Sequence, residues 1–267
     1  MKGHTALIPG GSPGIGLGIA RSLAQEGVNL AIASRNPDNT AIEELRGYGI
    51  DTLRVTADVS KEEQVIRMVA ETISHFGHLD HYVNNAVWEW HEPVTQLTTE
   101  AWMNTMRTNL SACVWACREV SRHMIQREKG SILIVGSTAS MAPLYKEASY
   151  RVSKTGLIAY GEVLAIELAP YNIRVNMLIP GPFVTRITEA FFAGEKSEVL
   201  RRIVPMKRIG QPEECGPAAV LLLSDKLSSY TTGSMLVIDR GLRLRPIEMY
   251  TDEDILAMNA PQSWERD

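Results

Sequence analysis

The sequence predicts an α/β fold in which one parallel sheet is covered by helices on both faces. Short apolar runs rich in β-branched residues alternate with longer segments of helical periodicity. The apolar runs are nearly continuous, as expected for strands buried on both faces. The chain has 267 residues, 45% of them hydrophobic, with no linker, low-complexity segment or internal repeat. This length fits one large α/β domain or two small ones. We expect a single domain over residues 1–241.

Seven apolar runs predict seven strands. They cover His4–Pro9, Val28–Ser34, Thr52–Asp58, Leu79–Asn85, Ser131–Ser137, Ile173–Pro180 and Ser234–Asp239. Helices are expected over Gly14–Glu26 and about Asp38–Tyr48, after a cap at Ser60, from near Thr99, and around Tyr150 and Lys154. Ser60 and Glu63 have the spacing of a capping box, in which each side chain bonds the other residue's backbone N–H.

Two segments interrupt this alternation. The connection Gly181–Gly210 is long for a compact domain, and we expect residues 182–210 to form a lid over substrate. Residues 242–267 follow the last expected strand and form a C-terminal tail.

Composition argues against several classes of protein. The net charge of −4 and a pI near 5.9 disfavour a nucleic-acid partner, which usually meets a basic face. No apolar run approaches the roughly 18 residues of a membrane span, and the first residues lack the apolar region of a signal peptide. We therefore expect a cytoplasmic protein without a membrane partner. Cys113, Cys117 and Cys215 form neither a disulfide framework nor a zinc spacing, so we expect buried free thiols and no metal.

A glycine-rich stretch follows the first expected strand and opens the first helix. Gly10, Gly14 and Gly16 have the spacing G-x-x-x-G-x-G, with Ser12 and Ile15 between them. The glycines permit a tight turn, a close approach of a phosphate and close packing of the helix. The first N–H groups of that helix then face a pyrophosphate. A glycine turn with no ligand is the alternative.

A phenol and an ammonium lie one helical turn apart at Tyr150 and Lys154. Ser137 ends the preceding strand, and Asn109 lies on the preceding helix. Ligands of open α/β sheets bind at the carboxyl ends of the strands. Ser137, Tyr150 and Lys154 are therefore expected to converge with the glycine turn at one edge of the sheet. The alternative is an ordinary contact on a helix surface.

Taken together and in this order, the motifs resemble those of the short-chain dehydrogenase/reductase family. The match covers nearly all of residues 3–241 and includes Asp58-Val59, the NNA stretch Asn84–Ala86 and PGPFVT at Pro180–Thr185. The chain resembles 3-oxoacyl-carrier-protein reductase-like and glucose dehydrogenase-like members of the family, and this resemblance implies a doubly wound Rossmann-type fold. It also implies a small-molecule carbonyl or alcohol substrate and a homotetramer with Thr99–Arg127 and Glu147–Ala169 at one interface.

The resemblance implies a role for each catalytic residue. Tyr150 exchanges a proton with the substrate oxygen, which Ser137 also hydrogen-bonds. Lys154 lowers the pKa of Tyr150 and holds the nicotinamide ribose, while Asn109 holds a water that links Lys154 to solvent. An ordinary phenol has a pKa near 10, too high for efficient proton transfer near neutrality without such help.

The resemblance also implies the coenzyme contacts. Asp58 would bond the adenine amino group beside Val59, and Asn85 and Ala86 would line the adenine ribose. The nicotinamide end would meet Pro180, Gly181, Val184 and Thr185. A simple helix cap is the alternative role for Asp58.

Three positions depart from the family pattern. Pro9 stands where threonine is common, Val87 replaces the glycine of NNAG, and the late DGG is Asp239-Arg240-Gly241. Because proline has neither a hydroxyl nor an N–H, we expect a tie between the glycine turn and the fourth strand to be missing.

The end of the second strand predicts the coenzyme. In this architecture an acidic residue there holds the ribose 2′-hydroxyl of NAD, whereas an arginine accommodates the 2′-phosphate of NADP. Here the position is Ser34, followed by Arg35, and no acidic residue occurs between Gly27 and Pro37. The sequence therefore favours NADP(H), with NAD(H) as the alternative.

The sequence leaves the substrate open. The expected pocket walls are Trp88, Trp90, Met141, Leu144, Tyr145, Phe183, Phe191 and Phe192, with Glu89, His91, Glu147 and Arg151 as polar groups. They suit a cyclic ketone, a sugar or a β-keto ester on a carrier protein almost equally. A sugar or polyol dehydrogenase working toward oxidation is one alternative. A non-catalytic nucleotide-binding scaffold is another, although it would need no Ser137–Tyr150–Lys154 set.

Overall fold

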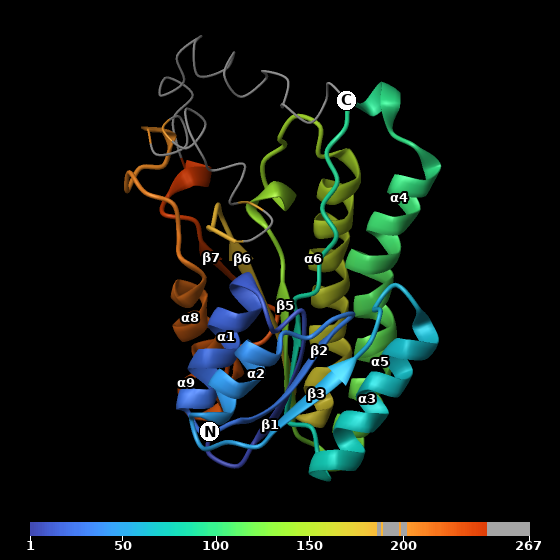
Figure 1. Cartoon of the computed structure of the whole chain (residues 1–267), viewed down its shortest axis with the longest axis vertical. Coiled ribbons are helices and arrows are strands. Elements are labelled where there is room, and N and C mark those ends of the chain that lie inside the picture. The colour runs from blue at the N-terminus through green and yellow to red at the C-terminus, as the bar shows by residue number, and fades with distance from the viewer. Residues whose placement is uncertain (186–187, 189–197, 199–201, 245–267) are drawn as a thin grey trace.

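A computed structural model describes residues 1–185, 188, 198 and 202–244 (Figure 1). Of the expected lid at residues 182–210, residues 186–187, 189–197 and 199–201, with Phe191 and Phe192, lie outside these residues. The tail is described only over Leu242–Leu244, a short 3-10 turn.

Seven parallel strands form one sheet, as predicted. They are β1 (Thr5–Pro9), β2 (Asn29–Ser34), β3 (Thr52–Thr56), β4 (His81–Asn84), β5 (Gly130–Val135), β6 (Ile173–Pro180) and β7 (Met235–Ile238). Their order across the sheet is β3-β2-β1-β4-β5-β6-β7. The chain order changes direction between β1 and β4, and ligands of open α/β sheets bind in the crevice outside such a point.

Helices cover both faces of the sheet, so the fold is doubly wound. They are α1 (Gly14–Gln25), α2 (Asn39–Arg46), α3 (Glu62–Phe76), α4 (Thr99–Thr105), α5 (Ala112–Arg127), α6 (Ala148–Leu168), α8 (Gly216–Leu223) and α9 (Asp225–Ser228). Figure 1 shows α3, α5 and α6 on one side of the sheet and α1, α8 and α9 on the other. Each side has its own buried apolar cluster, and every residue of β5 and β6 is buried between them.

The predicted capping box at Ser60 and Glu63 is wrong. Helix α3 begins at Glu62, after Lys61, and Lys61 makes no side-chain cap. Ser60 instead donates from both its backbone N–H (3.0 Å) and its hydroxyl (2.8 Å) to Oδ1 of Asp58. The Asp58 carboxylate thus uses the Ser60 hydroxyl in a turn before the helix, so the hydroxyl is not free to cap it.

Two expectations from composition can be compared with the fold. The three cysteines are buried free thiols, as predicted, and the sulfurs of Cys113 and Cys117 lie 3.8 Å apart. Among the described helices, none combines the length and apolar character that crossing a bilayer requires.

A buried arginine joins the sheet to the helices at the end of α8. Arg174 on β6 is only 6% exposed. Its guanidinium donates to the carbonyls of Leu222 (2.6 Å) and Leu223 (2.9 Å) and to the carboxylate of Asp225 (2.8 Å). These carbonyls belong to the last turn of α8, where backbone oxygens have no partner within the helix.

We expect Arg174→Met to lower the free energy of unfolding by about 3 kcal/mol, because it leaves buried carbonyls without donors. Chemical denaturation followed by circular dichroism measures the loss. Arg46→Met is the control, since it removes an exposed pair with Glu43 that is worth less than about 1 kcal/mol. Equal stability of the two variants would contradict this role for Arg174.

Candidate active site

The glycine turn has the backbone geometry that its sequence predicts. Gly10 and Gly14 have φ angles of 73° and 54°, a region that side chains with a Cβ rarely adopt. A Cβ on Gly16 would lie 2.1 Å from the carbonyl oxygen of Gly10, so only glycine fits there. Helix α1 begins at Gly14 with no acidic residue in its first turn. Its free N–H groups therefore form an anion site at the carboxyl end of β1.

The tie between the glycine turn and β4 is present, contrary to the expectation from Pro9. The side-chain amide of Asn85, just after β4, donates to the carbonyl of Gly10 at 2.9 Å and to that of Pro9 at 3.4 Å. The bond comes from the β4 side and needs only carbonyl acceptors, which proline retains. Ala86 also packs directly against Gly10.

The other residues predicted to bind coenzyme lie along the same edge. Ser34 and Arg35 end β2, Asp58 and Val59 follow β3, and Pro180 and Gly181 end β6. The segment after β6 crosses back to the glycine turn, because a Cβ on Gly14 would lie 3.1 Å from Cγ2 of Thr185. Val184 is held there by donating to Gly210 at 2.9 Å.

Two observations fit a nucleotide at this edge. The hydroxyl of Ser34 is buried and has no hydrogen-bond partner among the described residues, which is uncommon for a buried polar group unless a ligand supplies one. Arg35 beside it is exposed. Asp58 does not cap α3, whose N-cap is Lys61, and Ser60 bonds only its Oδ1 atom, so a contact of Asp58 with adenine is compatible with this structure.

Helix α6 brings the catalytic candidates together. The ammonium of Lys154 is buried, donates to the carbonyl of Val135 at 2.9 Å and lies 5.7 Å from the centre of the Tyr150 ring. Burial lowers the pKa of Lys154 to about 8. Ser137, two residues beyond the end of β5, hydrogen-bonds the Tyr150 hydroxyl. The predicted convergence of Ser137, Tyr150 and Lys154 is therefore seen.

The pKa of Tyr150 is raised well above its ordinary value, whereas the resemblance implied a lowered one. Burial is the largest cause and the Glu89 carboxylate the next, while the Ser137 hydrogen bond acts in the opposite direction. The physical reason is that removing the phenol from water opposes its charged form. Tyr150 therefore retains its proton near neutrality, as a proton donor must.

Asn109 lies in a π-helical turn, Met106–Ser111, between α4 and α5. Its side chain accepts from the backbone N–H of Trp88 at 2.7 Å and donates to the Trp88 carbonyl at 2.9 Å and to Ser153 at 3.0 Å. Turns of this kind are frequent at functional sites. Asn109 thus fixes the segment after β4 against α6, and its expected role in holding a water stays a prediction.

A cluster of ionisable side chains lies beside the catalytic residues. His91 Nε2 lies 3.2 Å from Oε1 of Glu89, and its Nδ1 lies 3.7 Å from Oε1 of Glu147. Burial lowers the pKa of His91, but the hydrogen bond and charge of Glu89, together with Glu147, outweigh it and raise the pKa. Sequence reasoning named these residues separately and missed the cluster. The only available signal was their position after β4 and just before Tyr150.

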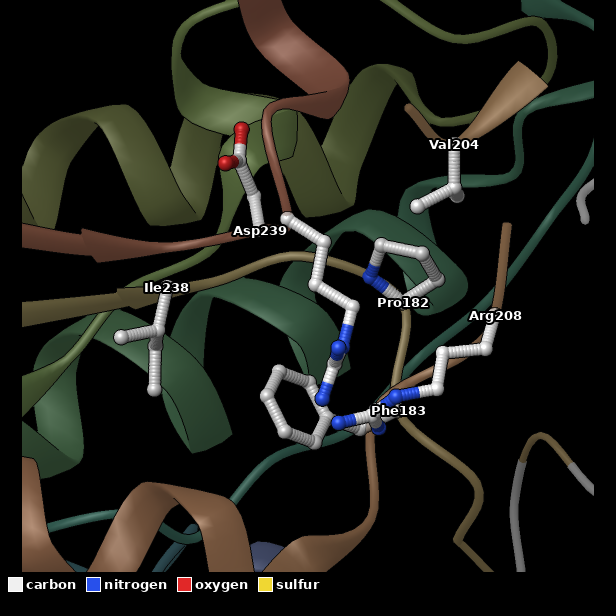
Figure 2. Close-up of a pocket in the computed structure, with 8 residues that line it drawn as sticks. Pro182, Phe183, Val204, Arg208, Ile238 and Asp239 are labelled. Carbon is white, nitrogen blue, oxygen red and sulfur yellow. The ribbon is translucent and has the colours of Figure 1, made fainter. Parts of the chain in front are cut away.

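Of the expected pocket walls, Phe183 is misplaced. It is 6% exposed and packs into the core on the α1 side, because its ring occupies the space beside Gly210. Figure 2 shows it in a small pocket with Pro182 and Arg208. The cavity of about 10 Å³ has room for roughly one water. It is not a substrate site.

The departure at Arg240 has a physical explanation. Arg240 has a φ of 55°, where glycine would be at ease. Its guanidinium pairs with the carboxylate of Glu214, which also pairs with Arg208 at 2.7 Å. The ion pair offsets the cost of this backbone conformation, which is about 1–2 kcal/mol.

Comparison with known proteins agrees with this geometry. Residues 10–243 match the family model described as Enoyl-(Acyl carrier protein) reductase. The human protein named Dehydrogenase/reductase SDR family member 4 is 35% identical over 245 residues, covering 90% of this chain and 88% of its own.

Two solved structures superpose closely. A gluconate 5-dehydrogenase from Burkholderia cenocepacia J2315, in complex with NADP and tartrate, is 31% identical with a TM-score of 0.87 over 92% of this chain and 97% of its own. An NAD+-bound xylitol dehydrogenase is 30% identical with a TM-score of 0.83 over 89% and 98%. With the family match and the Ser137–Tyr150–Lys154 site, these likenesses show that the chain is an oxidoreductase of the short-chain dehydrogenase/reductase family.

Proposed function

We propose that this enzyme interconverts a carbonyl and a secondary alcohol with NADP(H), using Tyr150 as the acid and base. The observation that supports this most directly is the half-buried Tyr150, with Ser137 bonded to its hydroxyl and Lys154 one turn further along α6. A scaffold that only binds nucleotide would gain nothing from burying a phenol and an ammonium here, since burial of polar groups costs free energy.

The coenzyme, when bound, supplies or accepts the hydride. Ser137 donates a hydrogen bond to the substrate carbonyl oxygen, and Tyr150 gives its proton to that oxygen during reduction. Lys154 holds the nicotinamide ribose and keeps positive charge beside Tyr150, which stabilises the phenolate left behind. The raised pKa of Tyr150 keeps the phenol protonated but opposes release of its proton, so the positive charge of Lys154 is needed during the transfer. Oxidation of a sugar or polyol by the same residues is the second candidate, because a xylitol dehydrogenase is among the structural neighbours.

We expect Tyr150→Phe to lose at least about 100-fold in turnover, the scale of general acid–base catalysis, because the ring stays and the proton is removed. The change in nicotinamide absorbance with a panel of carbonyls and alcohols measures turnover. The variant should still bind coenzyme. The matched control is Tyr160→Phe on the same helix, whose hydroxyl makes only a 3.5 Å contact with the carbonyl of Val114. Near-normal turnover of the Tyr150 variant would refute the assignment.

The preference for NADP(H) is proposed from Ser34 and Arg35. The unpartnered Ser34 hydroxyl can donate to a 2′-phosphate, and the Arg35 guanidinium can pair with it through two parallel N–H groups. An NADP complex and an NAD complex both occur among the structural neighbours, so the support comes from these two residues.

Arg35→Ala should weaken binding of NADPH by about 1.5–3 kcal/mol, the value of hydrogen bonds to a charged group, and leave NADH nearly unaffected. Fluorescence titration of both coenzymes measures the difference. Arg46→Ala on α2 is the control, because its guanidinium pairs with Glu43 instead. A wild-type enzyme that prefers NADH would overturn the interpretation of Ser34 and Arg35.

Assembly into a homotetramer is proposed from the family and from an apolar row on α6. Val152, Val163 and Ile166 are 47%, 50% and 77% exposed. Their spacing of eleven and three residues places them on one face of the helix. An exposed apolar row of this kind is typical of a protein–protein contact.

Light scattering at micromolar concentration should give the mass of four chains. Ile166→Glu should reduce that mass by placing a charge within the contact, whereas Ile66→Glu on α3, where the isoleucine is 39% exposed, should not. A monomeric wild-type protein would contradict the proposal.

A further inference from the structure

The cluster of Glu89, His91 and Glu147 is not used in the proton transfer, yet it adjoins the residues that perform it. Candidate ligand atoms of the three side chains all lie within 4.8 Å of one another. Glu147 precedes the first residue of α6 and stands three residues before Tyr150. The charges of Glu89 and Glu147 both raise the pKa of Tyr150, which shows that they act on the reacting phenol. Because Glu147 lies about one helical turn before Tyr150, a substrate held by Tyr150 would lie near this cluster.

Within the described part of the chain, no donor reaches Oε2 of Glu147. The side chain is nine-tenths buried, and its Oε2 atom is buried with no partner. The neighbouring cation Arg151 donates instead to the carbonyl of Ala139, and His91 Nδ1 stays 3.7 Å from the other carboxylate oxygen. A buried acceptor without a partner costs about 1–3 kcal/mol, which a ligand that donates a hydrogen bond recovers.

The charge of the cluster restricts that ligand. His91 is paired with Glu89 at 3.2 Å and balances one carboxylate, so Glu147 contributes a second negative charge when it ionises. Burial is the main cause that raises the pKa of Glu147 to about 7; His91 and Arg151 oppose this rise, and Glu89 adds to it. A carboxylate or phosphate on the substrate would meet repulsion here, whereas a neutral hydroxyl group would donate to Glu147 without it.

The segment that contains Glu89 also has an aromatic surface against which the carbon skeleton of a substrate can pack. The rings of Trp88 and Trp90 stack with centroids 6.4 Å apart and planes 5° from parallel, and Trp90 is 42% exposed. The indole Nε1 of Trp88 is a second buried polar atom without a partner, in this case a donor. An unpaired acceptor and an unpaired donor on segments flanking the catalytic phenol suit a substrate that has several hydroxyl groups.

We propose that Glu147, which lies beside His91 and Glu89, accepts a hydrogen bond from a non-reacting hydroxyl of an uncharged polyhydroxylated substrate. The inference rests on the proposed function and narrows its substrate to neutral sugars and polyols. It excludes sugar acids, phosphorylated sugars and simple ketones as preferred substrates.

The test measures binding without turnover. Alcohols are titrated calorimetrically onto the enzyme saturated with reduced coenzyme, NADPH and NADH in parallel, so that no hydride acceptor is present. The probes are xylitol and sorbitol, the acids xylonate and gluconate, and cyclohexanol, which has no additional hydroxyl. We expect the polyols to bind at least about 10-fold more tightly than the acids or cyclohexanol, the factor that corresponds to 1.4 kcal/mol.

Glu147→Gln should reduce the preference for binding polyols over acids about 10-fold or more, because it removes the charge of the side chain and keeps its shape. The affinity for cyclohexanol should not change. Polyol binding by the wild type should tighten from pH 6 to pH 8 as Glu147 ionises, and the pH dependence should flatten in the variant. Glu100→Gln, an exposed carboxylate on α4, is the matched control. Thermal melting checks that each variant folds. If Glu147→Gln does not fold, His91→Gln replaces it in the same titrations.

The outcomes separate the two proposals. Turnover of panel carbonyls with equal binding of polyols and acids overturns the hydroxyl site and leaves the proposed function standing. Selective polyol binding without any turnover supports the site and refutes the function. Polyol binding that is lost in chelator and restored by Zn²⁺ or Mg²⁺ would assign the cluster to a metal and overturn the inference.

Discussion

The buried ammonium of Lys154 constrains the whole catalytic edge. Its bond to the carbonyl of Val135 fixes α6 against the last residue of β5, and so sets where Tyr150 lies along the sheet. Two further contacts hold the same helix: Arg151 donates to Ala139 in the turn after Ser137, and Asn109 donates to Ser153. A charge that is taken out of water must keep its partners or be destabilised. The position of the phenol is thus set by backbone carbonyls, which side-chain substitution elsewhere does not remove.

Charge divides the proposed binding edge into two regions. Arg35 lies at the end of β2, where the ribose of the coenzyme is expected, and the first turn of α1 adds N–H groups without an opposing acid. Beyond Tyr150 lie Glu89 and Glu147. An anionic coenzyme and a neutral substrate are therefore each directed to their own part of the edge by electrostatics alone. The same carboxylates that disfavour acidic substrates also raise the pKa of Tyr150, so substrate choice and the protonation of the phenol share one physical origin.

Sequence alone predicted the sheet because β1, β2, β4, β5 and β6 are buried on both faces and their apolar runs are nearly continuous. It also predicted the convergence of Ser137, Tyr150 and Lys154, since the carboxyl ends of parallel strands meet at one edge. It failed to predict the partners of two hydrogen bonds. Ser60 bonds Asp58 instead of capping α3, and the missing threonine at Pro9 is replaced by an amide 76 residues away in sequence. These hydrogen-bond partners depend on the local geometry of turns and on distances between segments, and periodicity encodes neither.

The carboxylate of Glu214, which pairs with both Arg208 and Arg240, connects two segments of the chain. Glu214 stands between a residue near the end of the 182–210 connection and a residue just after β7. The Glu214 carboxylate attracts both guanidinium groups. Without this anion, the two guanidinium groups would repel each other. Loss of that single negative charge would therefore change the sign of an interaction, not merely weaken it. Glu214 thus joins the segment that follows the edge strand to the end of the 182–210 connection through charge alone.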